Sequence, residues 1–164
     1  MVDTLSAQLT NRDATPRVLD DSRETKARLM ESCALLEAGA GDASDSTYRF
    51  FSVPSNARVS QILLSCDDLG TAGAVDIGVY QTTDNGSAVV DADLFSSAQV
   101  LTTALTNSDV TYESGQYNVD ESEKPLWSVL GLSADSNRDY DIVATVTAAP
   151  ESAGTIVLKG RFVV

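Results

Sequence analysis

Short runs in which apolar and polar residues alternate follow one another through residues 47–164. This alternation has the period of β-strands that bury one face and expose the other. The clearest runs are residues 75–81, 140–146 and 156–164. Turn-forming residues separate the runs at a spacing typical of β-sandwiches and barrels. The pattern therefore predicts a mostly β domain, and because it continues to the last residue we expect no further domain after it.

Two hairpins are expected within this pattern. The runs 47–53 and 58–66 are separated by Pro54, Ser55 and Asn56, which we interpret as the turn of a hairpin. The runs 75–81 and 87–91 flank an Asn-Gly pair, which supplies the positive φ angles of a tight turn. These two runs should therefore also pair antiparallel.

One helix is predicted at residues 122–131. Ser122 can cap it, Pro125 falls in its first turn and Gly131 ends it. We expect this helix to close one end of the sheet pair, with Trp127 in the core. The alternative, a Trp127 side chain that stacks on a ligand, is less consistent with its apolar neighbours.

Residues 28–38 fit two interpretations. Leu29, Cys33 and Leu36 match one face of a helix, whereas Leu29, Cys33 and Leu35 with acidic residues between them suit an edge strand. The sequence leaves both open.

The first thirty residues differ in character, because they are polar and carry almost no core-forming period. The chain is therefore predicted to consist of an N-terminal arm, residues 1–30, and a β-sandwich domain, residues 31–164. The basic residues of the arm are candidates for contact with a partner: Arg12, Arg17, Arg23, Lys26 and Arg28. The alternative is a solvated tail whose arginines bind nothing.

Charge is unevenly divided along the chain, whose net charge is −13. Residues 1–31 carry five basic and six acidic side chains, whereas residues 32–164 carry six basic and eighteen acidic ones. A domain this acidic repels polyanions, and it lacks the basic stripe with which proteins neutralise phosphates. We therefore expect no nucleic-acid partner.

Few residues suggest catalysis. The chain has no histidine, so Ser-His and Cys-His nucleophile pairs are excluded, and it contains no glycine-rich phosphate loop. Cys33 and Cys66 have no metal-ligand spacing and are expected to be structural thiols. Paired carboxylates remain conceivable, but nothing in the sequence supports them. We expect no enzymatic activity and no cofactor.

One acidic turn resembles part of a calcium loop. Asp135, Asn137 and Asp139 match its first, third and fifth ligand positions, but Tyr140 and Val146 stand where glycine and glutamate are needed. A polar turn before a strand fits better, and no metal site is predicted.

The N-terminal sequence MVDTLSAQLT lacks the basic and apolar regions of a secretory leader. No apolar run approaches the roughly 18 residues of a membrane span. We expect an aqueous, reducing compartment and no membrane partner.

The closing strand offers two alternatives. Val157 and Val163, with Lys159 and Arg161 between them, form a half-apolar outer face that suits a subunit contact. The same strand suits an ordinary sheet edge equally well, with the two basic residues as guards against aggregation.

Several strings resemble the small head proteins of tailed bacteriophages, which are decoration, or cement, proteins of the capsid. These strings are NRDATPRVL (11–19), YRFFSVPSNARVS (48–60), DIGVYQT (76–82), VVDADLF (89–95), and LWSVLGL (126–132) followed by YDI (140–142). They cover most of the chain, and none is a catalytic motif.

The resemblance implies a jelly-roll-like antiparallel β-sandwich with one short helix and an extended N-terminal arm. It also implies a homo-oligomer, a dimer or trimer, made in the host bacterial cytoplasm and bound to the major capsid protein on the capsid exterior. The alternative is a head-fibre or glycan- or receptor-binding module of the same fold, which should expose aromatic residues in a groove.

Overall fold

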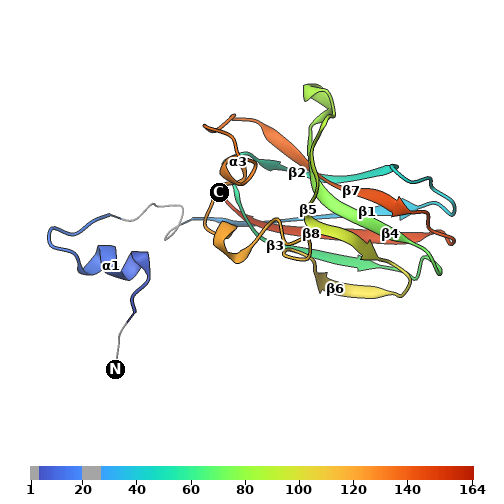
Figure 1. Ribbon diagram of the computed structural model, residues 1–164, viewed down its shortest axis with the longest axis horizontal. Helices are drawn as coiled ribbons and strands as arrows, with labels where there is room; N and C mark the ends of the chain where they lie inside the picture. Colours follow the sequence, from blue (N-terminus) through green and yellow to red (C-terminus); the bar gives the residue numbers. More distant parts are fainter. Residues whose placement is uncertain (1–3, 20–26) are drawn as a thin grey trace.

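Two antiparallel β-sheets pack face to face, and the N-terminal helix stands apart from them (Figure 1). The structure is a computed structural model that describes residues 4–19 and 27–164. Its helices and strands, in chain order, are α1 (Ala7–Asp13), β1 (Leu29–Ala38), β2 (Thr47–Pro54), β3 (Arg58–Cys66), β4 (Ala74–Gln81), η1 (Thr83–Asn85), β5 (Val89–Val100), β6 (Leu105–Asp109), η2 (Val119–Glu121), α3 (Leu126–Val129), β7 (Asp139–Ala148) and β8 (Gly154–Val163).

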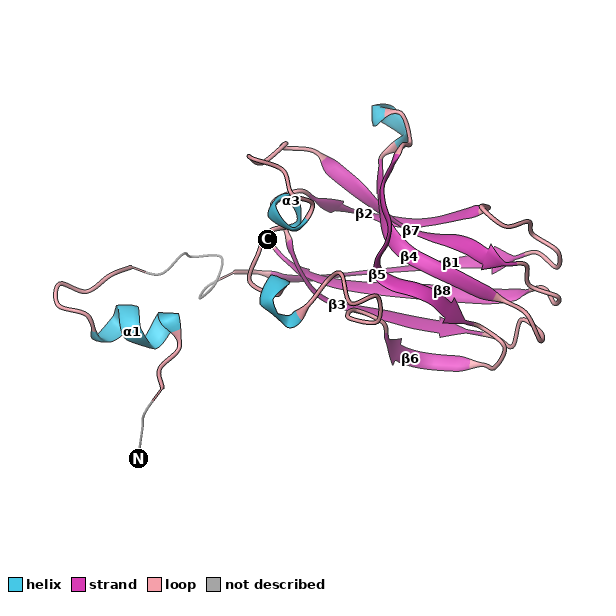
Figure 2. Cartoon of the chain, in the orientation of Figure 1, coloured by secondary structure: helices cyan, strands magenta, loops and turns pink. Residues whose placement is uncertain are grey.

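The strand order is β1-β8-β3-β6 in one sheet and β2-β7-β4-β5 in the other (Figure 2). Successive strands from β1 to β4 alternate between the two sheets, as in an eight-stranded jelly roll. The predicted fold class, a jelly-roll-like antiparallel sandwich, is confirmed.

The core lies between the two sheets, and β8 contributes alternate residues to it. In this strand Ile156, Leu158 and Phe162 are buried, and the residues between them are partly exposed. Gly160 belongs to the same inner face, where a Cβ atom would clash with the Phe51 ring that packs there. In β8 the period-two pattern of the sequence is therefore the pattern of burial, whereas β4 and β7 also contain runs of consecutive buried residues.

The two predicted hairpins have different outcomes. β4 and β5 pair antiparallel, as predicted, and the turn between them uses left-handed backbone at Gly86 and Ser87. The predicted β2–β3 hairpin is wrong, because β2 pairs with β7 while β3 pairs with β6 and β8. The connection instead crosses from one sheet to the other, and its residues Ser55 and Ala57 are buried.

The helix α3 is hydrogen-bonded to this connection between β2 and β3. The backbone N–H of Leu126 donates to the Ala57 carbonyl at 2.8 Å, and that of Trp127 donates to the Ser55 carbonyl at 2.9 Å. The helix is shorter than predicted, because Pro125 is its N-cap and Ser122 ends η2 instead. Leu126 enters the core, whereas Trp127, expected there, is only half-buried.

Residues 29–38 form strand β1, so the strand interpretation of this segment is correct. β1 pairs with β8 along its whole length, which places β8 between β1 and β3. The interpretation of β8 as a sheet edge is therefore wrong, and Lys159 and Arg161 do not guard an open edge. The division into an arm, residues 1–30, and a domain, residues 31–164, stays a prediction.

Candidate attachment surfaces

Residues 4–19 of the arm are organised by local hydrogen bonds. Ser6 caps α1, since its Oγ accepts from the Leu9 N–H at 3.4 Å. After the helix the chain turns back, and the Val18 N–H donates to the Asn11 carbonyl at 3.2 Å. No residue of α1 is buried. The helix was not predicted, because its seven residues are too few to show a period.

Arg12 and Arg17 lie near one carboxylate. Arg12 Nε donates to Asp13 Oδ1 at 2.7 Å, and its Nη2 donates to Oδ2 at 3.0 Å. These bonds lower the pKa of Asp13, and the charge of Arg17 adds to the effect. Arg12 therefore already has a partner within the arm, and Arg17 is exposed.

The remaining predicted basic residues are Arg28, Arg23 and Lys26. Arg28 is exposed at the start of β1, where its backbone exchanges two hydrogen bonds with Val164. Arg23 and Lys26 lie outside the described residues.

Sequence reasoning missed the apolar residues of the arm. Leu5 is 49% exposed, Leu9 38%, Val18 49% and Leu19 86%. Leu5 and Leu9 are four residues apart, a spacing that would have drawn attention to them if a helix had been predicted here. Apolar side chains that remain exposed together on a short segment are typical of a protein contact.

The solvent-exposed face of the β1-β8-β3-β6 sheet, called the outer face below, carries a polar ladder. Arg161 Nε donates to Glu31 Oε2 at 2.7 Å, and its Nη1 donates to Gln61 Oε1 at 2.9 Å. Gln61 Nε2 in turn donates to Asp109 Oδ2 at 2.8 Å. The ladder crosses all four strands and occupies Arg161 within the sheet.

Apolar cross-strand pairs lie on both sides of the ladder. Val157 is opposite Leu35, and Val163 is opposite Leu29. Both valines are half-buried, while Leu29 is 61% and Leu35 59% exposed. The leucines of β1 thus present more apolar surface than the two valines predicted from the sequence, whose role in a subunit contact stays a prediction.

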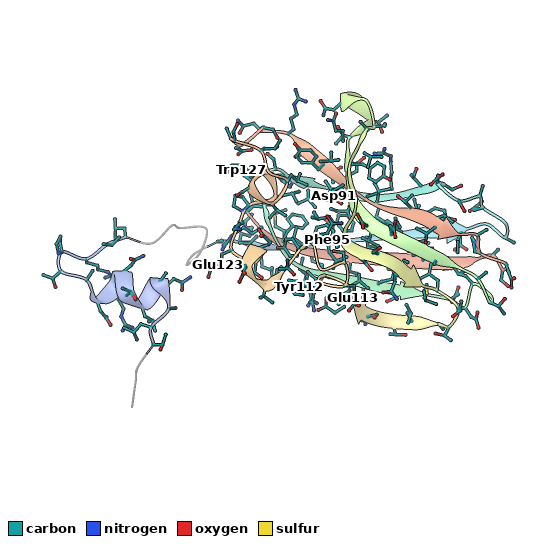
Figure 3. All side chains as sticks on the ribbon, in the orientation of Figure 1. Asp91, Phe95, Tyr112, Glu113, Glu123 and Trp127 are labelled. Carbon is teal, nitrogen blue, oxygen red and sulfur yellow. The ribbon has the colours of Figure 1, made fainter. Side chains whose placement is uncertain are left out.

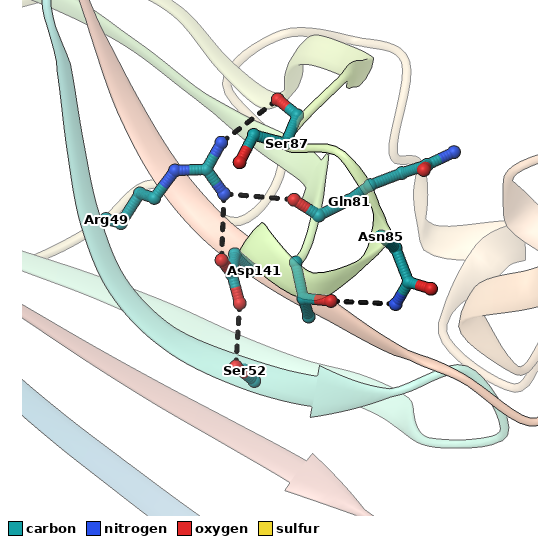
Figure 4. Close-up of polar contacts among 7 residues, drawn as sticks. Arg49, Ser52, Gln81, Asn85, Ser87 and Asp141 are labelled. Carbon is teal, nitrogen blue, oxygen red and sulfur yellow. Dashed lines mark hydrogen bonds and ion pairs between the residues drawn. The ribbon is translucent and has the colours of Figure 1, made fainter.

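An arginine network joins the second sheet to the β4–β5 turn (Figure 4). Arg49 Nη1 donates to Asp141 Oδ2 at 2.8 Å and to the Gln81 carbonyl at 3.0 Å, and its Nη2 donates to the Ser87 carbonyl at 3.1 Å. Asp141 also accepts from Ser52 Oγ at 2.7 Å. Because Arg49 and Asp141 bond to groups of the fold itself, this network supports the turn.

An open polar pocket of about 480 Å³ lies beside this network and includes Asp84, Asp139 and Asp141. Over residues 4–19 and 27–164, no three acidic, cysteine or histidine side chains are grouped so that they could hold a metal ion. The acidic turn nearby behaves as a turn, because Asp135 accepts from the Asn137 backbone N–H at 2.9 Å and from the Ser55 hydroxyl.

Aromatic rings gather near the end of the sandwich from which the arm extends (Figure 3). Tyr117 is buried and packs against Phe95, with ring centroids 5.2 Å apart, and against Tyr112 at 5.6 Å. Tyr112 is 40% exposed and stacks on Tyr117. It therefore offers one ring to solvent in a fixed orientation.

Two carboxylates on β5 interact. Burial raises the pKa of Asp91, and the neighbouring charge of Asp93 raises it further. The Asp93 N–H donates to Asp91 Oδ1 at 3.3 Å, and Gln116 Nε2 donates to Asp93 Oδ1 at 2.8 Å. Phe95, on the same strand, is 0% exposed and cannot stack on a substrate.

No protein-family model matches this chain, and no curated protein matches it. Solved structures do. A chain of the cyanophage Pam1 capsid asymmetric unit is similar with a TM-score of 0.50 and 16% identity, over 100% of this chain and 99% of that one. A chain of the Ralstonia phage GP4 capsid is similar with a TM-score of 0.54 and 16% identity, over 85% of this chain and 84% of that one. The fold recurs in two phage capsids.

At 16% identity these likenesses show the fold alone. In the part of the chain that the structure describes, no helix has the length and apolar character needed to cross a membrane.

Proposed function

We propose that this chain is a structural virion protein, without enzymatic activity, that binds the outside of a phage capsid lattice and stabilises the head. Its partner in this proposal is the major capsid protein, and the N-terminal arm provides part of the attachment. The observation that carries the proposal is the likeness to the Pam1 capsid chain, because it spans this whole chain rather than the sandwich alone.

The charge distribution supports an arrangement with the sandwich toward solvent. Residues 32–164 carry twelve more acidic than basic side chains, which favours solubility, whereas residues 1–31 are nearly neutral. An arm of thirty residues reaches at most about 100 Å when extended, so it can cross from one capsid subunit to its neighbours.

Two kinds of arm residue are proposed to contact the lattice. The exposed apolar side chains of Leu5, Leu9, Val18 and Leu19 gain free energy when a partner covers them. The basic residues Arg12, Arg17, Arg23, Lys26 and Arg28 are proposed to pair with carboxylates of the partner.

Co-sedimentation with heads assembled without this protein tests the proposal. The full chain should sediment with the heads and raise the temperature at which they rupture. A variant that lacks residues 1–26 retains Arg28, whose backbone bonds to Val164, and should remain folded but bind far less. A full chain that stays in the supernatant would refute the proposal.

A glycan- or receptor-binding module remains the second candidate, favoured by the exposed and stacked ring of Tyr112. If this function is correct, Tyr112→Ala should abolish binding on a glycan array while head binding is unchanged. Absence of glycan binding by the unaltered protein would remove this candidate.

A further inference from the structure

The sandwich has four edge strands, β1, β6, β2 and β5, and β1 differs from the other three. Register shifts interrupt the pairing of β2 with β7, of β6 with β3 and of β5 with β4. β1 pairs with β8 over ten consecutive residues without a shift. Bulges protect sheet edges against further pairing, and a long regular edge invites it. β1 is therefore the edge best suited to accept another strand.

The backbone groups of β1 alternate between β8 and the open edge. Arg28 exchanges both of its backbone hydrogen bonds with Val164, and in an antiparallel pair every second residue does so. The even-numbered residues of β1 therefore bond to β8. The N–H and C=O groups of the odd-numbered ones point to the open edge: Leu29, Glu31, Cys33, Leu35 and Glu37.

The side chains of β1 are poorly covered for a strand of this length. Met30, on its inner face, is 44% exposed, and Leu29 and Leu35 on its outer face are 61% and 59% exposed. The strand has no lysine or proline, the residues that commonly protect an edge.

We propose that β1 pairs antiparallel with β1 of a second copy of this chain, about a two-fold axis at Cys33. This register joins all five open odd-numbered residues, with Cys33 opposite Cys33, Glu31 opposite Leu35 and Leu29 opposite Glu37 of the second copy. On the inner face it brings Met30 opposite Leu36.

The positions of the carboxylates and the length of the strand favour this register. An axis at Ala34 places Glu31 opposite Glu37, and an axis at Glu31 places the two copies of Glu31 opposite each other; like charges directly opposite destabilise a strand pair. An axis at Cys33 avoids both oppositions and uses the strand over its full length. The inferred occupant is a second copy, because β1 can pair with itself through all five open residues without placing two carboxylates opposite each other.

The pairing joins two arms in one particle of protein, and the benefit of this for attachment rests on the proposed function. Each arm enters at the start of its β1, so the two arms of an antiparallel pair leave from opposite ends of the joined strands, about 30 Å apart. Two arms that bind neighbouring lattice sites raise each other's effective concentration.

Opposite charges at one exposed position test the register. Leu35→Glu places a carboxylate opposite Glu31 of the partner copy in each of the two symmetry-related pairs, whereas Leu35→Lys places a cation there. Analytical ultracentrifugation of the free protein should find a dimer for the unaltered chain and for Leu35→Lys. The dissociation constant of Leu35→Glu should be at least about tenfold higher. Melting temperatures of the two variants show that both are folded.

Cys33 reports the same contact independently. It is exposed, Cys66 is buried, and both thiols are free. Cα atoms opposite each other in a hydrogen-bonded antiparallel pair are about 5.5 Å apart, within the range that a disulfide spans. Mild oxidation or a short bis-maleimide should therefore link two copies in the unaltered chain and in Cys66→Ser, but not in Cys33→Ser.

Three results would overturn the inference: a monomer at every concentration, equal dissociation constants for the two Leu35 variants, or a dimer that does not cross-link through Cys33. A monomer would leave the β1 edge to an extended segment of another protein, and the last two results would place the dimer contact on another surface of the chain. All of these measurements use free protein, so a failure of this inference can be distinguished from a failure of the proposed head binding.

Discussion

Leu19 provides the sharpest test of how the arm attaches. It is 86% exposed and has almost no contact to lose in the free protein, so its replacement cannot act through the fold. Burial of a leucine side chain contributes about 1.5–3 kcal/mol, and Leu19 can gain nearly all of this on the lattice. Leu19→Ser should therefore weaken each arm by about 2 kcal/mol, or roughly 30-fold in its dissociation constant.

Arg12 gives the comparison, because its guanidinium already pairs with Asp13 at 2.7 Å and both side chains are about half exposed. An exposed ion pair contributes only about 0–1 kcal/mol, and a new partner must first replace the old one. Arg12→Ala should therefore weaken binding by less than about tenfold.

Titrated co-sedimentation with heads that lack the protein measures both variants, with Leu19→Met as the control that keeps an apolar side chain. The expected order of affinity is unaltered chain, Leu19→Met, Arg12→Ala and Leu19→Ser. If Leu19→Ser binds like the unaltered chain while Arg12→Ala does not bind, the arm attaches by charge and the apolar argument is refuted.

Three further predictions concern the sandwich, and urea unfolding measures each of them. Tyr117→Phe removes the 2.6 Å hydrogen bond from the buried hydroxyl to the Val59 carbonyl and should lower the free energy of unfolding by about 1–3 kcal/mol; an unchanged midpoint would show that this bond adds nothing. Gly78→Ala places a methyl group against the Asp91 backbone carbonyl and should destabilise the protein by about 3 kcal/mol, whereas a neutral effect would mean that β5 can move away. Burial and Asp93 raise the pKa of Asp91 in the folded state, so the stabilisation from its protonation is present at acidic pH and is lost as pH rises through the raised pKa. Asp91→Asn should therefore be more stable relative to the unaltered chain at neutral pH than in acid. The opposite trend would contradict the assigned cause.

The strands were largely predictable from the sequence, because burial of one sheet face imposes a period of two that remains visible in the residues. β8 follows this pattern closely, and β4 follows it over residues 74–77. The ambiguity at β1 has a physical origin, because most of its residues are exposed and only Ala38 is buried. Leu29 and Leu35, which suggested a core face, are themselves exposed.

The pairing of the strands was not predictable from local pattern. A short turn-like segment between β2 and β3 suggested a hairpin, but Pro54 and Ser55 carry the chain across the sandwich to the other sheet. What fixes this path is a long-range contact, the hydrogen bonds from α3 to Ser55 and Ala57. No local signal in the sequence encodes those partners.

The candidate attachment residues were only partly predictable. Basic residues are conspicuous in a polar segment, so Arg12 and Arg17 were identified, but the sequence did not reveal that Arg12 is paired with Asp13. Leu5 and Leu9 were overlooked because two apolar residues in a polar segment form no core pattern. Their importance becomes clear only when the structure leaves them exposed.

A cryo-EM map of the phage head that contains this protein tests the central claim most directly. The account predicts density for the jelly roll on the outer surface of the shell, with the arm following the major capsid protein and Leu19 covered by it. Density for the protein inside the shell or on the tail, or an arm with no contact to the lattice, would contradict the account.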